Sequence, residues 1–246
     1  NREGRTSETR EELLTGTVAE RKTPRTTKGK LKDASTPVVK NLAQLTDGWA
    51  WACVEEDGRL QRGRQRAPKY HAGANMRPYL RVQNVFEDRI DLSDVMEMEF
   101  SEADFERFEL HNGDVLLNEG QSPEFLGRPA IYRTQLPGAC FTNTLIRFQA
   151  YGCALPEFAL IVFRHCMHSG RFAKESNITT NTAHLSLGRL ATVEFPVPPI
   201  AEQQRIVFEF DRQMSIVCEV EAEVDANLKR AQTLRQATLA KVFSTC

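Results

Sequence analysis

The chain has 246 residues, of which 41% are hydrophobic and 26% charged, and its formal net charge is −1. This length allows one sizeable domain plus an appendage, and the composition is that of a soluble globular protein. No apolar run approaches the roughly 20 residues that a membrane span needs, and no charged-then-apolar leader of the secretory type opens the sequence. The six cysteines contain no CxxC pair, which argues against a disulfide framework or a zinc ribbon. We therefore expect a cytoplasmic protein with reduced thiols.

The first predicted segment, residues 1–40, is polar and basic. TSETREELL favours one short helix, with Glu11 and Glu12 near its start, where the helix dipole favours acids. Residues 21–32 then carry six basic residues and no acid, a composition typical of a solvated linker. The segment is predicted to be a linker with one short helix.

The second segment, residues 41–199, is predicted to be a mixed domain, because short β-rich runs alternate with Gly and Pro turns. The runs are YLRVQNV, GDVLLNEG, PAIYRT and CFTNTLIRFQA. LPEFALIVFRHCMHSG favours a helix with Pro156 in its first turn and Gly170 at its end. SEADFERFEL favours a shorter helix that Ser101 would cap. Its apolar residues are expected to face the sheet: Phe105, Phe108 and Leu110.

The third segment, residues 200–246, is predicted to be one long helix. Proline occupies three of the four positions 196–199, and residues 200–243 contain neither proline nor glycine. Because proline cannot continue a preceding helix and favours extended backbone before it, PVPP separates the domain from the helix. At about 1.5 Å per residue, the helix would be roughly 65 Å long.

Apolar residues recur along this helix at alternating spacings of three and four, the pattern of a coiled-coil seam. Glu221 and Arg235 interrupt the seam. The stripe needs a partner helix, from another chain or from a missing part of this one. The predicted fold class is therefore α+β, a mixed domain followed by a long C-terminal coiled-coil helix. The predicted interface comprises Val207, Phe210, Met214, Val217, Val224, Leu228 and Ala231.

Several motifs resemble the specificity (S) subunit of type I restriction–modification enzymes. FPVPPIAEQQRIVFEF and LKRAQTLRQATLAKVF resemble the start and end of a long helix in that family. TTNTAHLSLGRLATVEFPVPP resembles the junction between its target recognition domain and the helix, and LLNEGQSPEFLGRPAIYR with CFTNTLIRF resemble motifs inside that domain. The resemblance covers residues 45–244. It implies a target recognition domain over 41–199 and a dimerisation or spacer helix over 200–246.

The resemblance implies a non-catalytic subunit that binds one half of a bipartite double-stranded DNA target. It would hold the methyltransferase (M) subunits, and a restriction/translocase (R) subunit would join through the complex, in the cytoplasm of a bacterium or archaeon. The sequence contains no Asn- or Asp-Pro-Pro-aromatic motif and no glycine-rich loop for a nucleotide or S-adenosylmethionine. No cofactor is expected.

The usual subunit of the family has two recognition domains and two helical regions, whereas this sequence has one of each. Two interpretations stay open: a second half of a longer subunit, or a half-length subunit that dimerises. In either case the helix would pair, in an antiparallel coiled coil, with the missing half or with a second copy.

Three polar segments are candidates for DNA contact. RLQRGRQRAPKY carries arginines that suit guanine, a glutamine that suits adenine, and further cations for phosphates. EGQSPEFLGR and SNITTNTAH carry polar side chains, and those of the latter suit phosphate positioning. For each segment a structural role, as a solvated loop, a connection or a turn, stays open. The candidate residues are Arg62, Arg64, Gln65, Arg66, Lys69 and Tyr70 in the first segment, Gln121, Ser122 and Arg128 in the second, and Asn177, Thr179, Thr180 and Asn181 in the third.

Two other patterns are interpreted as structural. His165 and His168 lie three residues apart, but they lack a third ligand signature and so do not predict a metal site. Asp104, Glu106 and Glu109 are expected to form a solvated acidic face rather than paired catalytic carboxylates.

Two other classes of function are alternatives to DNA recognition. In one, the chain is a coiled-coil protein–protein adaptor without DNA specificity, which would show no affinity for any duplex even with its methyltransferase partner present. The other, an enzyme with its own methyltransferase or nuclease centre, conflicts with the missing motifs.

If the helix separates two recognition domains, its length of roughly 65 Å corresponds to under two turns of duplex. Deleting whole heptads within 207–235 is then expected to shorten the non-specific spacer and leave the half-site bases unchanged. Mapping the methylated targets of the assembled complex measures both. Deletions that altered the bases but not the gap would contradict this ruler.

Overall fold

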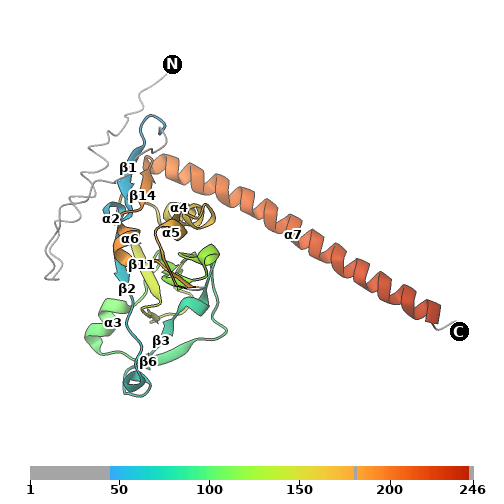
Figure 1. Ribbon diagram of the computed structural model, residues 1–246, viewed down its shortest axis with the longest axis horizontal. Coiled ribbons are helices and arrows are strands. Elements are labelled where there is room, and N and C mark those ends of the chain that lie inside the picture. Colours follow the sequence, from blue (N-terminus) through green and yellow to red (C-terminus); the bar gives the residue numbers. More distant parts are fainter. Residues whose placement is uncertain (1–44, 180–181, 244–246) are drawn as a thin grey trace. The chain divides into compact units, whose positions relative to one another are not determined.

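The computed structural model describes residues 45–179 and 182–243, with the backbone alone for residues 177–179 and 182 (Figure 1). The chain divides into two compact units, Asn1–Gln204 and Arg205–Cys246. The predicted linker and short helix within residues 1–40 lie outside the described residues. The predicted fold class, mixed helices and strands followed by a long C-terminal helix, is confirmed.

The elements of the described residues alternate short strands with short helices in the first unit. The strands are β1 (Ala50–Cys53), β2 (Gly58–Arg62), β3 (Met76–Leu80), β4 (Val85–Phe86), β5 (Arg89–Ile90), β6 (Met96–Glu99), β7 (Val115–Asn118), β8 (Gly120–Gln121), β9 (Pro129–Ile131), β10 (Cys140–Phe141), β11 (Leu145–Ala150), β12 (Asn177–Thr179), β13 (Thr182–His184) and β14 (Glu194–Val197). The helices are α2 (Val54–Asp57), α3 (Glu102–Phe108), α4 (Pro156–His168), α5 (Arg171–Lys174), α6 (Leu187–Ala191) and α7 (Ile200–Phe243), and 3-10 turns cover Pro68–Tyr70, Val82–Asn84 and Pro123–Phe125.

The central sheet is antiparallel, in the order β2-β11-β7-β9. All four residues of β7 are buried, and α4 packs against β9, β11 and β7. The predicted helix begins at Pro156, whose missing N–H costs nothing in a first turn. It ends before Gly170, which takes the left-handed conformation at φ 70° that glycine adopts without strain.

A cluster of phenylalanine rings fills the core between α4 and the strands. Phe148 of β11 meets Phe163 of α4 edge to face, with ring centroids 5.1 Å apart. Phe195 of β14 lies within 6.3 Å of the rings of Phe148, Phe158 and Phe163. Because β14 also pairs with β1, the last strand before the long helix is held in the main core.

A second, mixed sheet of order β10-β3-β6 lies with α3 at the end of the unit opposite β1 and β14 (Figure 1). The Ser101 hydroxyl caps α3 by accepting from the Asp104 N–H at 3.2 Å, as predicted. Phe108 and Leu110 are buried, and Phe105 packs against the same core. The expected run YLRVQNV is divided after Leu80, because the Asn84 side chain accepts from the Arg81 N–H and turns the chain.

Arg147 of β11 joins the central sheet to α3, although arginine is rarely buried and its side chain is only 4% exposed. One nitrogen donates to the Glu109 carbonyl (2.6 Å) and to Asp114 (3.3 Å). The other donates to Gln61 (2.7 Å) and to the Arg107 carbonyl (3.2 Å). Burial lowers the pKa of this guanidinium, and the Asp114 carboxylate opposes that effect. The C-terminal end of α3 is thereby fixed to the central sheet.

The helix α7 begins directly after the proline step, as predicted, and runs unbroken to Phe243. Its first turn is held by Gln203, which is fully buried. The Gln203 side chain accepts from the Leu155 N–H (2.8 Å) and donates to the carbonyls of Cys153 (2.8 Å) and Pro198 (2.9 Å). Gln203, the first glutamine of the AEQQ motif, therefore supplies hydrogen-bond partners for three backbone groups that lie outside regular secondary structure.

The coiled-coil seam stays a prediction, but three of its residues are exposed on α7 and could pack against a second helix. Val217, Val224 and Leu228 are 45%, 59% and 56% exposed.

Of the helices that the structure describes, none combines the length and the apolar character needed to cross a membrane. No disulfide joins any two cysteines in the described part of the chain.

Replacing Gln203 by leucine removes all three bonds while keeping the volume. Because a buried polar group left without a partner costs about 1–3 kcal/mol, the free energy of unfolding is expected to fall by about 2 kcal/mol or more. Urea unfolding measures the change. The neighbouring Gln204 is exposed, so Gln204→Leu should change stability by less than about 0.5 kcal/mol. Equal effects of the two substitutions would contradict the role given to Gln203.

Candidate nucleic-acid interface

The basic loop, residues 62–70, follows a fixed path along the turn between β10 and β11. The Gly63 N–H donates to the Leu145 carbonyl (3.3 Å) and the Arg64 N–H to the Phe141 carbonyl (3.0 Å). The Arg64 carbonyl accepts from the Asn143 N–H at 3.0 Å. A Cβ atom at Gly63 would collide with the carbonyl oxygen of Thr142, so this close approach requires glycine.

Arg64 faces inward, and its side chain is only 11% exposed. Its guanidinium donates to the Glu99 carbonyl and pairs with Asp104 at 3.1 Å. It also stacks 3.9 Å from the ring centroid of Tyr70 and 4.8 Å from that of Phe100. Arg64 therefore braces the loop against β6 and α3. Asp104, which the sequence predicts to lie on a solvated acidic face, therefore also has a structural role as the ion-pair partner of Arg64.

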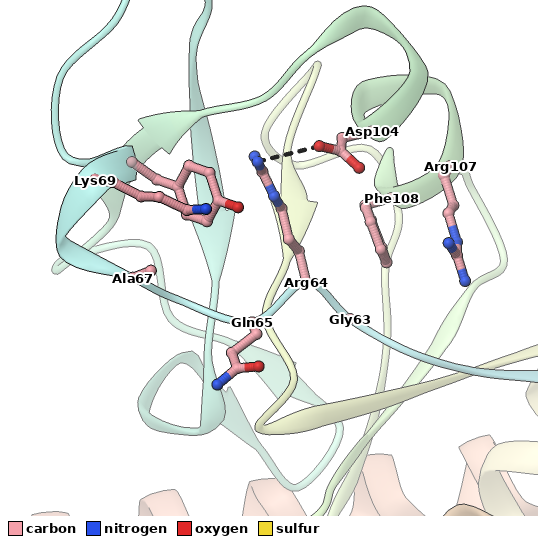
Figure 2. A pocket seen from close by; sticks show the side chains of 9 residues that line it. Gly63, Arg64, Gln65, Ala67, Lys69, Asp104, Arg107 and Phe108 are labelled. Carbon is pink, nitrogen blue, oxygen red and sulfur yellow. Dashed lines mark ion pairs between the residues drawn. The ribbon is translucent and has the colours of Figure 1, made fainter.

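The other members of the loop are accessible. Gln65, Arg66 and Lys69 are exposed. Arg66 lies 5.6 Å from the ring centroid of Tyr79, and Lys69 lies 4.9 Å from that of Tyr70. Hydrogen bonding from Lys69, and then from Arg64, lowers the pKa of the Tyr70 phenol. Between this loop and α3 lies an open hollow of about 470 Å³, which Figure 2 shows from close by.

The three predicted segments meet at Glu119. Arg62, at the end of β2, forms an ion pair with the Glu119 carboxylate, which also lies 3.6 Å from the His184 ring nitrogen. Just beyond Glu119, β8 pairs with β13, with Gln121 opposite Ala183 and Gly120 opposite His184. The fold thus brings Arg62 of the first segment, Glu119 of the second and His184 of the third together, although 57 residues separate Arg62 from Glu119.

In the second segment, the side chain of Arg128 is held by contacts inside the domain. Arg128 donates to the Val85 carbonyl at 3.1 Å, and its guanidinium lies 4.8 Å from the ring centroid of Phe86 and 5.3 Å from that of Phe125. Burial lowers its pKa. Gln121 and Ser122 are half-buried, and the Ser122 N–H donates to the Gln121 side chain at 3.3 Å.

The third segment is described in part. Asn177 and Thr179 lie in β12, which pairs with β13. Thr180 and Asn181 lie outside the described residues. DNA contact by each of the thirteen candidate residues stays a prediction.

Sequence reasoning missed Glu119, His184 and Arg107. The first two acquire a role only through contacts between distant segments. Arg107 lines the hollow from α3, but it stands in a stretch, 87–109, with ten acids and one other basic residue. The sequence offered one signal for Arg107. It lies three residues after Asp104, and residues at this spacing share one face of a helix.

One histidine of the pair on α4, His168, has a partner in the structure. His168 lies 2.8 Å from the Glu87 carboxylate, which also pairs with Arg164 at 2.7 Å. Among the described residues, no group of three or more His, Cys, Asp or Glu side chains could hold a metal ion.

A mixed domain leads through a proline step into one long helix, and comparisons with known proteins show which proteins this architecture is similar to. No family model matches the chain. It is 27% identical over 168 residues to the type I restriction enzyme EcoKI specificity subunit of Escherichia coli (strain K12), an alignment that spans 68% of this chain and 36% of that protein. It is 22% identical over 145 residues to the putative type I restriction enzyme MjaX specificity subunit of Methanocaldococcus jannaschii, over 57% of this chain and 34% of that protein.

Solved structures show the same fold. The HsdS subunit from Thermoanaerobacter tengcongensis matches with a TM-score of 0.55 at 18% identity, over 84% of this chain and 43% of that one. A structure that describes the assembly and conformational transition of a type I R-M system matches with a TM-score of 0.54 at 21% identity, over 76% and 44% of the two chains. The resemblance to type I specificity subunits is thus confirmed. The chain spans about a third of the length of the curated relatives that it matches.

Replacing Arg64 by lysine keeps the charge but removes the planar guanidinium. That group donates to the Glu99 carbonyl, pairs with Asp104 and stacks on Tyr70. The free chain is expected to lose about 1–2 kcal/mol of unfolding free energy. Thermal or urea unfolding measures this loss. Arg66→Lys is the matched control, because Arg66 is exposed and should tolerate the change within about 0.5 kcal/mol. Unchanged stability in Arg64→Lys would mean that Arg64 is not a brace.

Proposed function

We propose that this chain is the DNA-recognition part of a type I restriction–modification system. It binds one half of a bipartite double-stranded target and carries no catalytic centre of its own. Its long helix holds the methyltransferase subunits, and the restriction/translocase subunit joins through the assembled complex. The system acts in the cytoplasm of the cell.

The observation that carries the proposal is the convergence of the three candidate segments. The three segments are far apart in the chain. One residue from each lies at the same point of the domain, because Glu119 pairs with Arg62 and lies beside His184. In the first of these segments, Gln65, Arg66 and Lys69 are accessible. Arginine, lysine and glutamine side chains are those that bind phosphates and base edges in DNA complexes.

The similarity to the two curated specificity subunits supports the same function. These proteins are named as the parts of restriction enzymes that provide specificity. A chain that matches about a third of each one fits a protein with one recognition domain and one helical region. We infer that two such halves, from one longer subunit or from two copies, together recognise the complete target.

The long helix supports a scaffolding role. It presents Val217, Val224 and Leu228 of the predicted seam, which are 45–59% exposed. Exposed aliphatic residues at spacings of three and four suit burial against a second helix. The proposed interface is therefore an antiparallel coiled coil, with a second copy or the other half.

A protein–protein adaptor without DNA specificity is the alternative. It would use the same helix but would have no need for accessible cations held in a fixed loop. The two functions differ in a measurable way, since binding that releases counterions from duplex DNA weakens steeply with salt.

The test uses the purified chain, alone and with a methyltransferase subunit of a type I system. Fluorescence anisotropy with a labelled mixed-sequence duplex is expected to show binding that weakens as salt increases. Arg66→Gln removes one accessible cation of the loop and should reduce the magnitude of the slope of log K against log salt concentration by about one.

Lys174→Gln is the control, because Lys174 is an exposed cation of α5, outside the three segments. It should leave the slope unchanged. No affinity for any duplex, with the methyltransferase subunit present, would favour the adaptor and refute DNA recognition.

A further inference from the structure

The hollow between the basic loop and α3 contains more positive charge than its surroundings compensate. Arg64 lies in its middle, Lys69 lies on one side and Arg107 on the other (Figure 2). Asp104 pairs with Arg64 at 3.1 Å, so these two charges cancel. Within the described part of the chain, no carboxylate forms an ion pair with Lys69 or Arg107. Two cations at the hollow are therefore left for a ligand.

Arg107 is held in place before any ligand arrives. Its carbonyl accepts from the Gln61 side chain (3.0 Å) and from buried Arg147 (3.2 Å), which anchors the backbone. Its guanidinium lies 5.2 Å from the ring centroid of Phe108, a residue that is only 7% exposed. An aromatic ring held in the core restricts the arginine side chain, so less conformational entropy is lost when that side chain binds.

Lys69 is positioned in a similar way on the opposite side. Its ammonium lies 4.9 Å from the ring centroid of Tyr70, and that ring is in turn stacked on Arg64. The ammonium and the guanidinium both donate hydrogen bonds and accept none. Gln65 adds an exposed amide to the lining. Such a set of donors suits an anionic group with several oxygens, of which phosphate is the commonest.

We propose that this hollow is a phosphate-binding site in which Arg107 and Lys69 contact phosphate groups of one strand of the duplex. The proposal rests on the proposed function and adds Arg107, from outside the three predicted segments, to the DNA-binding surface. Contacts to phosphates carry no sequence information and instead fix the orientation of the duplex. Arg107 and Lys69 thus orient the DNA, and base recognition falls to other residues.

The experiment measures binding of the full chain to two unrelated duplexes of equal length over a series of salt concentrations. Arg107→Gln and Lys69→Gln are each expected to reduce the magnitude of the salt slope by about one, and the double variant by about two. The loss of affinity should be the same for both duplexes. Arg107→Lys should restore the slope, because it keeps the charge.

Arg89→Gln is the matched control. Arg89 is also an exposed arginine on an aromatic ring, 4.7 Å from the centroid of Phe86, but it lies on β5 and does not line the hollow. It differs from Arg107 in one further respect, a long ion pair of 3.8 Å with Asp91. It should leave the slope unchanged. Circular dichroism and thermal unfolding of every variant separate lost binding from lost folding.

Three outcomes would overturn the proposal. A slope for Arg107→Gln equal to that of the wild type would remove Arg107 from the interface. A loss of affinity for one duplex only, with the slope unchanged, would make Arg107 a base-contacting residue. Binding of inorganic phosphate or pyrophosphate that Arg107→Gln abolishes, while duplex binding is unaltered, would assign the hollow to a small anion. If the wild type binds no duplex, the proposed function itself fails, which is a different result from all three.

Discussion

The interaction on which the candidate interface depends is the buried side chain of Arg147. Its two terminal nitrogens reach the central sheet through Gln61 and Asp114, and the end of α3 through the carbonyls of Arg107 and Glu109. A charge that leaves water must be compensated, and here two backbone carbonyls, a carboxylate and an amide do so. Because those partners come from α3, β2 and the start of β7, satisfying one arginine fixes three elements. The hollow and the basic loop are built on this frame.

The arginines and lysines near the interface divide by their partners. Arg62 pairs with the Glu119 carboxylate, whereas Arg64 and Arg128 donate to the backbone carbonyls of Glu99 and Val85 and also lie over rings. Arg64 has a carboxylate partner as well, Asp104. Arg66, Lys69 and Arg107 lie over the rings of Tyr79, Tyr70 and Phe108. A ring orients a cation without neutralising it, whereas a carboxylate cancels its charge. Among the described residues, Lys69 and Arg107 lie over a ring and form no ion pair with a carboxylate, so an anionic ligand can still attract them.

The similarity to type I specificity subunits covers only part of each relative. The two curated relatives are each about three times the length that the alignment covers. Under the proposed function, a bipartite target would need two recognition domains at a set distance, and a stiff helix is the simplest structure that could set such a distance. The Gln203 bonds tie the first turn of α7 to the backbone at Leu155, Cys153 and Pro198.

The sequence by itself determined the elements whose signals are local. The long helix from Ile200, the capped helix after Ser101 and the helix from Pro156 were all predicted, because caps, proline steps and apolar periodicity act within a few residues. Tertiary structure alone decided which cations are paired. Arg64 and the Glu99 carbonyl are 35 residues apart, and Arg62 and Glu119 are 57 apart, so no local pattern reveals either contact. The same holds for Arg107, whose acidic neighbours in sequence concealed a side chain that the fold places beside the basic loop.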